Sequence, residues 1–184
     1  CSAARGATET TGQQTQGIDL ADRRVFKMSL GDTQLPSEAY IYNECIEKGY
    51  VLLGYGEALD FTGCQNRADV IARLKQVKPD ISSNDYSISS VAYLMFEVKK
   101  GDLILVSDGN TQFRAIGEVI GDYEFVKRED TFSQKRAVRW LRVFDESQPI
   151  DLIFGKRLSQ MTLYLLDQQS IKREALQALL TPAA

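Results

Sequence analysis

The side chains best suited to catalysis are two carboxylates and a lysine in the order of the PD-(D/E)xK pattern. Pro79-Asp80 precedes Glu97-Val98-Lys99 across a spacer. In sites of this kind two carboxylates hold a divalent metal and the lysine lies near the attacked phosphate. The pattern needs its acids on adjacent strands, whereas Asp80 opens a Ser/Asn-rich loop and Glu97 ends a helical pattern. A metal-dependent nuclease is therefore an alternative hypothesis and not the main one.

Other common catalytic arrangements are absent from the sequence. It has no histidine, and its three cysteines, Cys1, Cys45 and Cys64, show no C-x-x-C spacing. This composition excludes a histidine-based triad and a structural zinc site. There is also no G-x-x-x-x-G-K-[ST] sequence and no dinucleotide fingerprint. We therefore expect a domain that recognises a ligand without performing chemistry and without a metal or cofactor.

Positive charge is concentrated locally, although the chain as a whole is slightly acidic. The chain has 22 Lys and Arg residues and 25 Asp and Glu residues, which gives a net charge of −3. The net charge by itself therefore does not favour binding to a polyanion such as nucleic acid. Basic residues nevertheless gather around Trp140: Lys127, Arg128, Lys135, Arg136, Arg139 and Arg142. Basic side chains beside an aromatic ring can hold phosphates while a base stacks, and a solvated face is the alternative interpretation. Lys127, Arg136 and Arg139 are the expected phosphate contacts.

Aromatic residues are the second group that could bind a ligand. Any one of them can instead belong to the core, and only positions in loops or at strand ends are well placed to line a pocket. Tyr55 and Tyr123 stand at the ends of expected strands, and Phe61 stands in an expected loop. Tyr93 and Trp140 complete the set of candidates.

One domain must position these residues. The chain has 184 residues and 43% hydrophobic content, which suits a single core. Residues 1–23 are rich in Thr, Gln, Gly and Ala and are expected to form a disordered linker or tail, followed by the domain over 24–184. No apolar run reaches the length of a membrane span and no signal peptide is evident, so we expect a cytoplasmic protein. The Cys-Ser-Ala start suits a mature lipoprotein or a fragment of a longer protein, and we expect the fragment.

Hydrophobic periodicity predicts an α+β fold. The first helix is expected to begin at Pro36 and to end at Gly49. Three further helices are expected over 67–77, 87–99 and 171–180. Strands are expected over 24–29, 50–55, 136–143 and 162–166, and within 101–125, where turns are expected at Asp108-Gly109-Asn110 and Gly121-Asp122. Short strands that return on themselves favour a small barrel with peripheral helices over a parallel sheet.

Four segments in a fixed order carry a family resemblance. They are GYVLLGY (49–55), VKKGDLILV (98–106), AIGEVIGDYEF (115–125) and RAVRWLRV (136–143). Over 25–166 the chain resembles the EVE/YTH-like members of the PUA superfamily, especially the N-terminal target-recognition domains of McrBC-type modification-dependent restriction proteins. The resemblance implies a twisted β-barrel with peripheral helices and a pocket that accepts a modified base flipped out of DNA, or splayed from RNA. Related proteins commonly have Trp where this chain has Tyr55, so the preferred modification stays open.

Together, these observations lead us to expect a reader of nucleic acid that carries a methylated adenine or cytosine, and we expect the nucleic acid to be DNA rather than RNA. The resemblance also implies a covalently linked AAA+ GTPase domain and a separately recruited nuclease in the full-length protein. A protein-interaction module whose pocket is filled by its own side chains is a further alternative. The expected base-binding residues are Tyr55, Phe61, Tyr93 and Trp140 as aromatic pocket residues, with Asp60 and Ser29 as partners of the base edge.

Overall fold

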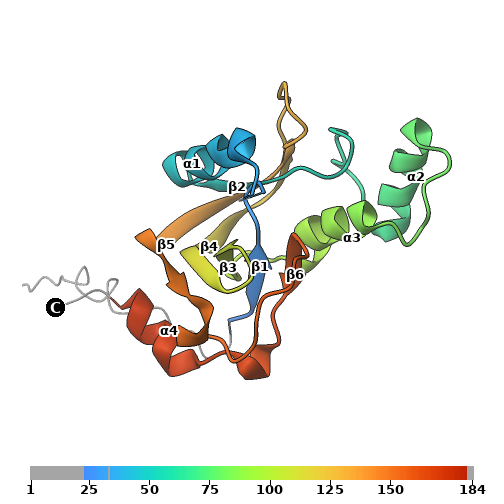
Figure 1. The fold of residues 1–184 in the computed structure, drawn as a ribbon. Coiled ribbons are helices and arrows are strands. Elements are labelled where there is room, and N and C mark those ends of the chain that lie inside the picture. Colours follow the sequence, from blue (N-terminus) through green and yellow to red (C-terminus); the bar gives the residue numbers. More distant parts are fainter. Residues whose placement is uncertain (1–22, 33, 182–184) are drawn as a thin grey trace, which may run out of the picture.

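The computed structural model describes residues 23–32 and 34–181, so residues 1–22 of the expected tail, with Cys1, lie outside it (Figure 1). The described chain folds into one mixed sheet with α-helices around it. The strands are β1 (Val25–Met28), β2 (Tyr50–Leu53), β3 (Leu103–Asp108), β4 (Gln112–Phe125), β5 (Gln134–Pro149) and β6 (Leu163–Leu165). The α-helices are α1 (Ala39–Lys48), α2 (Arg67–Val77), α3 (Tyr86–Ala92) and α4 (Arg173–Leu180). Short helical turns are η2 (Pro36–Glu38), the π-helical η3 (Tyr93–Glu97), η4 (Ile150–Leu152) and η5 (Gln168–Ser170).

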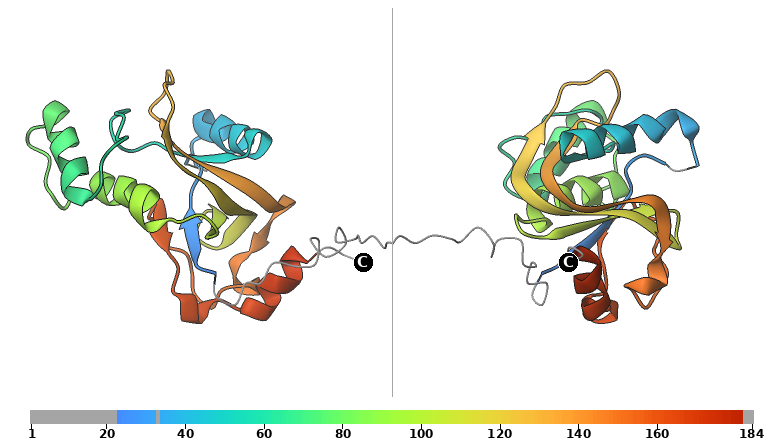
Figure 2. Two further views of the ribbon diagram at one scale, coloured as in Figure 1. Left: turned by 180° about the vertical axis from the view of Figure 1, so that it is seen from behind. Right: turned by 90° about the vertical axis from the view of Figure 1, so that its left-hand side faces the viewer.

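The sheet has the order β2-β5-β4-β3-β1-β6. β1 runs parallel to β3 and antiparallel to β6, and the remaining pairs are antiparallel. Figure 2 shows that the two longest strands, β4 and β5, bend strongly, so that the sheet is curled. The expected α+β class is confirmed, and the strand pairing is that of an open mixed sheet.

The two faces of the sheet carry separate hydrophobic clusters. In β1, Phe26 and Met28 belong to the first cluster, whereas Val25 belongs to the second. Helices α1, α2 and α3 contribute to the first cluster, and α4 contributes to the second. Figure 1 shows α4 on a different side of the molecule from α2 and α3. Because side chains alternate along a strand, Lys27 and Ser29 point to the same side as Val25, where they replace apolar residues.

Two turn signals in the sequence have the expected structure. Helix α1 ends at Gly49, which adopts a left-handed φ of 79° that few other residues tolerate. Gly109, with a φ of 75°, lies in the tight turn between β3 and β4. Both predictions are confirmed.

The predicted turn at Gly121-Asp122 is wrong. Strand β4 continues through these residues, and its pairing with β5 is irregular between Val119 and Tyr123. A Cβ atom on Gly121 would lie only 2.9 Å from the Cβ of Ala137. The glycine therefore permits a close approach of two strands at a bulge and does not reverse the chain.

The helix predicted over 87–99 is shorter and divided. It begins at Tyr86, where the Asp85 side chain accepts a hydrogen bond from the Ser87 backbone nitrogen, and its α-helical part ends at Ala92. The π-helical turn that follows spans Tyr93–Glu97. Hydrophobic periodicity identified this element but not the change in its winding.

Candidate functional site

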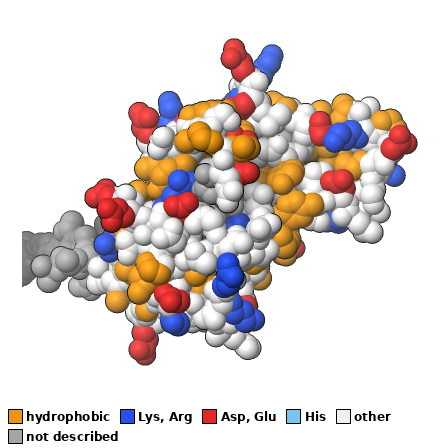
Figure 3. Space-filling view, in the orientation of Figure 1, with side chains coloured by type: hydrophobic (Ala, Val, Ile, Leu, Met, Phe, Trp, Pro, Cys, Tyr) orange, Lys and Arg blue, Asp and Glu red, His pale blue; other side chains and the backbone are white. Residues whose placement is uncertain are grey.

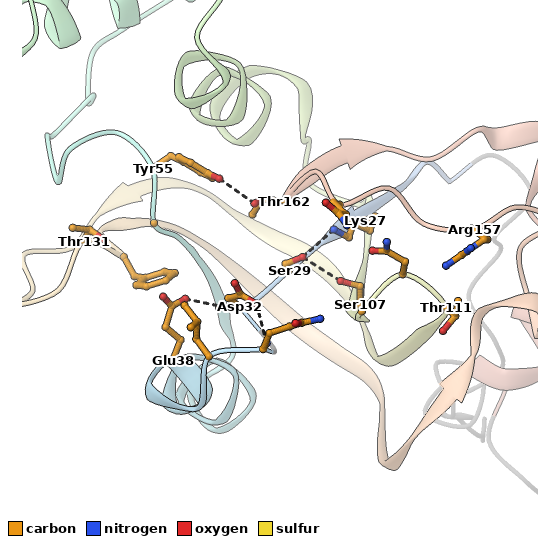
Figure 4. Close-up of a pocket in the computed structure, with 18 residues that line it drawn as sticks. Lys27, Ser29, Asp32, Glu38, Tyr55, Ser107, Thr111, Thr131, Arg157 and Thr162 are labelled. Atoms are coloured by element: carbon orange, nitrogen blue, oxygen red, sulfur yellow. Dashed lines mark hydrogen bonds between the residues drawn. The ribbon is translucent and has the colours of Figure 1, made fainter.

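A cavity of about 810 Å³ opens where β1 and β3 end. Five segments line it: the end of β1 with the following loop, the residues after β2, the β3–β4 turn, the residues before β5, and the segment before β6. Figure 4 shows their side chains converging on one space. Its size is in the range of cavities that hold small ligands or single nucleotides.

The floor of the cavity is polar and contains a buried lysine. Lys27 is only 2% exposed, and its Nζ donates hydrogen bonds to Ser29 Oγ at 2.9 Å and to the Met161 carbonyl. Ser29 Oγ in turn lies 3.2 Å from Ser107 Oγ. An ammonium has three N–H donors, so the third has no hydrogen-bond acceptor among the residues that the structure describes. Burial lowers the pKa of Lys27 to about 8.

Aromatic side chains line one end of the cavity. Tyr55 is 36% exposed, and its ring stands edge-on to Tyr86 with 5.4 Å between ring centroids. Phe132 lies against Gly54, where an added Cβ would come within 2.9 Å of the phenyl ring. Glycine at this position therefore lets the ring pack directly on the backbone beside Tyr55. Two flat apolar surfaces are available to a ligand here.

The other end of the cavity carries a free cation. Figure 4 places Arg157 and Tyr55 at opposite ends, with Lys27 and Ser29 between them. Arg157 is exposed and makes no hydrogen bond or ion pair within the described part of the chain. It also borders a second cavity of about 430 Å³, which shares Thr111 with the first. A guanidinium in this position can receive an anion.

The loop after β1 forms one wall of the cavity and is held by its own carboxylates. The Glu38 carboxylate accepts a hydrogen bond from the Asp32 backbone nitrogen at 2.9 Å, and Asp32 Oδ1 accepts one from the Gln34 backbone nitrogen at 2.8 Å. These bonds satisfy backbone donors that a strand no longer engages. The two acids therefore shape the wall and are not paired with Lys27.

Two of the six expected base-binding residues line this cavity. Tyr55 and Ser29 come together there, as described above. Phe61 has no exposed surface and belongs to the first hydrophobic cluster. Tyr93 packs edge-on against Phe26, with 6.3 Å between ring centroids. Phe61 and Tyr93 therefore support the fold, away from the cavity.

Trp140 and Asp60 also have structural partners outside the cavity. Trp140 Nε1 donates a hydrogen bond to the Cys45 carbonyl at 2.9 Å, which ties β5 to α1. Its ring covers Gly117, where a Cβ would lie 2.8 Å away. Asp60 lies in the loop after β2, and its carboxylate accepts a hydrogen bond from the Thr62 backbone nitrogen at 2.9 Å. Neither residue is among those that line the cavity.

Arg136, an expected phosphate contact, is used inside the protein. It is 3% exposed, and its Nη1 donates to the carbonyls of Leu94 and Val98, each at 2.7 Å. Its Nε donates to the Gly121 carbonyl at 2.8 Å. The guanidinium thus joins β5 to η3, to the residue that follows η3, and to the bulge in β4. It has no surface from which to reach a phosphate.

The other two expected phosphate contacts are exposed, but they do not line the cavity. Arg139 Nη2 forms an ion pair with Glu118 Oε1 at 2.5 Å, and Lys127 lies between β4 and β5. On the face shown in Figure 3, basic and acidic side chains are interspersed and do not form one positive patch. The basic cluster that the sequence suggests is therefore divided between buried, paired and solvated positions.

The nuclease pattern is not assembled as its chemistry requires. Asp80 follows α2 and Glu97 ends η3, so neither acid stands on a strand, and both are exposed, as is Lys99. Within residues 23–32 and 34–181, no group of three or more His, Cys, Asp or Glu side chains is arranged to hold a metal ion.

Several cavity residues were not expected from the sequence. Lys27, Ser107, Phe132 and Arg157 all line it. The alternation of Lys27 with Phe26 and Met28 indicates a solvated lysine, whereas all four residues of β1 are buried. Ser107 lies in β3, and Phe132 and Arg157 lie in loops whose arrangement depends on the folded sheet.

Comparison with known proteins adds the family of the chain. No helix in the described part is long and apolar enough to cross a membrane. No curated protein matches the sequence. A family described as a domain of unknown function (DUF8426) matches residues 26–167, a range that includes every residue lining the larger cavity. Because this match covers most of the chain, the protein belongs to the DUF8426 family.

Proposed function

We propose that this protein binds nucleic acid through a modified base and that the cavity between Tyr55 and Arg157 receives the flipped base. The observation that carries the proposal is the order of groups along the cavity: aromatic rings at one end, hydrogen-bonding side chains on the floor and a free guanidinium at the other end. The parts of a nucleotide require interactions in the same order. Its base stacks, its base edge forms hydrogen bonds and its phosphate attracts a cation.

The energies are compatible with this role. Flipping a base out of a duplex costs a few kcal/mol. Stacking on an aromatic side chain contributes about 1 to 3 kcal/mol per base, and a hydrogen bond to a charged group contributes about 1.5 to 3 kcal/mol. Tyr55 or Phe132 together with Lys27 can therefore offset the cost of flipping.

The fold we propose for this function is a PUA-like twisted barrel of the EVE/YTH type. Three observations support it: the strong bend of β4 and β5, the helices at the periphery, and the position of the four resembling segments on β2, β3, β4 and β5. By the same resemblance, we propose that the domain is the target-recognition part of a cytoplasmic modification-dependent restriction system. It would act on DNA and be linked to an AAA+ GTPase domain, with cleavage by a separate nuclease.

Replacing Tyr55 with alanine is expected to weaken binding to methylated oligonucleotides by roughly tenfold to a hundredfold, because one stacking surface is lost. The fold should remain intact because the Tyr55 side chain is partly exposed. The measurement is fluorescence anisotropy with labelled duplexes that carry N6-methyladenine, 5-methylcytosine or no modification.

The matched control is Tyr40→Ala, since Tyr40 is also a partly exposed tyrosine, 45% exposed, but lies on α1 and does not line the cavity. It should leave binding unchanged. Equal binding of the wild-type protein to all three duplexes, or no binding to any, would contradict the proposed function.

A further inference from the structure

The position of Lys27 in the sheet is unusual for a charged side chain. In the strand register it stands opposite Leu105 of β3 and Tyr164 of β6, and its neighbour on the same face of β1 is Val25. Val25 and Leu105 are both in the second hydrophobic cluster. Burying an ammonium in such surroundings is unfavourable unless a partner compensates it.

The charged groups around the cavity do not provide that partner. Asp32 and Glu38 accept hydrogen bonds from backbone nitrogens of their own loop, Arg157 is itself a cation, and neither acid forms an ion pair with Lys27 in the described structure. The nearest aromatic group is the Tyr164 ring, whose centroid is 5.9 Å from Nζ. The two hydrogen-bond acceptors of Lys27 are a hydroxyl and a carbonyl, both neutral. One N–H of a buried cation is therefore left for a ligand.

We propose that Lys27 determines which base the cavity accepts, by donating this N–H to a carbonyl oxygen of the base. This inference rests on the proposed function. The ligands it selects are cytosine, thymine, guanine and their modified forms, each of which carries a carbonyl oxygen. Adenine has no carbonyl oxygen at any edge, so it would place either its amino donor or a weaker ring-nitrogen acceptor against the ammonium. A methylated cytosine is therefore favoured over a methylated adenine.

A base and not a phosphate is the better partner for Lys27. Its ammonium lies on the buried floor, between the aromatic end of the cavity and Arg157 (Figure 4). A phosphate remains strongly hydrated and joined to the rest of the strand, so it belongs near the exposed guanidinium of Arg157. The base is the part of a nucleotide that can be desolvated and inserted to this depth.

The test compares single-stranded oligonucleotides of one sequence whose central base is 5-methylcytosine or N6-methyladenine, because single strands remove differences in base pairing. The wild-type protein should bind the 5-methylcytosine strand about tenfold more tightly or better. Lys27→Met should weaken that binding by roughly tenfold to a hundredfold and change binding to N6-methyladenine by less than about threefold. Lys75→Met, which removes an exposed lysine on α2, should leave both affinities within about twofold. Thermal unfolding of both variants checks that they remain folded.

Two results would overturn the assignment of Lys27 alone: binding of N6-methyladenine by the wild-type protein at least as tightly as 5-methylcytosine, or an equal loss of both affinities in Lys27→Met, which would indicate a phosphate contact. A wild-type protein that binds neither strand, nor the methylated duplexes, would overturn the proposed function and this inference with it.

Discussion

Replacing Arg136 with methionine is expected to lower the free energy of unfolding by about 3 kcal/mol, because it removes the donor of three short hydrogen bonds. The carbonyls of Leu94, Val98 and Gly121 accept these bonds at 2.7 to 2.8 Å, and the arginine is almost completely buried. A buried acceptor left without a donor costs about 1 to 3 kcal/mol, and the loss is only partly offset because a buried charge is also removed. A small domain has a total stability of about 5 to 15 kcal/mol, so the variant should show a clearly lower denaturation midpoint.

Arg139→Met is the matched control, since it removes an arginine three positions along the same strand. Arg139 is 60% exposed and, among the described residues, pairs only with Glu118, so its replacement should change stability by less than about 1 kcal/mol. Urea denaturation followed by tryptophan fluorescence measures both variants. Equal stability of the two would contradict the structural role assigned to Arg136. Arg136→Met should not be used to test phosphate binding, because weaker binding would then reflect a weakened fold.

Most elements of the fold could be predicted from local sequence signals. The helix after Pro36 and its end at Gly49, the tight turn at Gly109 and the first strand all depend on the conformational preferences of nearby residues. Gly121 shows the limit of such signals. A glycine followed by an aspartate favours a turn locally, but here the close contact with Ala137 on a neighbouring strand decides the structure.

The cavity was harder to predict because it depends on long-range pairing. The segment 24–29 alternates between apolar and polar residues, which normally indicates one buried face and one solvated face. In β1 the face that carries Lys27 is also covered, because the second hydrophobic cluster, which includes Val25 and Leu105, packs on that side of the sheet. Arg136 shows the converse error. A cluster of basic residues in the sequence suggests a surface, whereas a guanidinium that carbonyls surround can be buried.

The stability of the wild-type protein is expected to rise by about 3 kcal/mol between pH 7 and pH 10.5 through Lys27 alone. The pKa of this lysine is lowered by burial from 10.5 to about 8. Below pH 8 the folded and the unfolded states both hold the proton, and the folded state bears the full cost of a buried charge. Between pH 8 and pH 10.5 the folded state releases the proton first, so its stability rises with pH. Lys27→Met should lack this rise and should already be more stable than the wild type at pH 7, by about 1 to 2 kcal/mol after the loss of two hydrogen bonds.

Other groups act in the opposite direction at high pH, so the measurement must be a difference between proteins. Burial raises the pKa of Cys45 and of Tyr123 to about 12, and each therefore lowers stability as the pH rises above its unfolded value. Subtracting the Lys27→Met curve from the wild-type curve, both obtained by urea denaturation from pH 7 to pH 10.5, cancels these contributions. Lys75→Met should follow the wild-type curve throughout.

Parallel curves for wild type and Lys27→Met would show that burial of the Lys27 ammonium has no free-energy cost. A difference that rises with pH would identify Lys27 as a residue that reduces stability in the absence of ligand. Lys27→Met should therefore be more stable than the wild type and should also lose the preference for 5-methylcytosine over N6-methyladenine. A lysine that only stabilised the fold would give the opposite result for stability, so the two measurements together distinguish a ligand-binding role from a structural one.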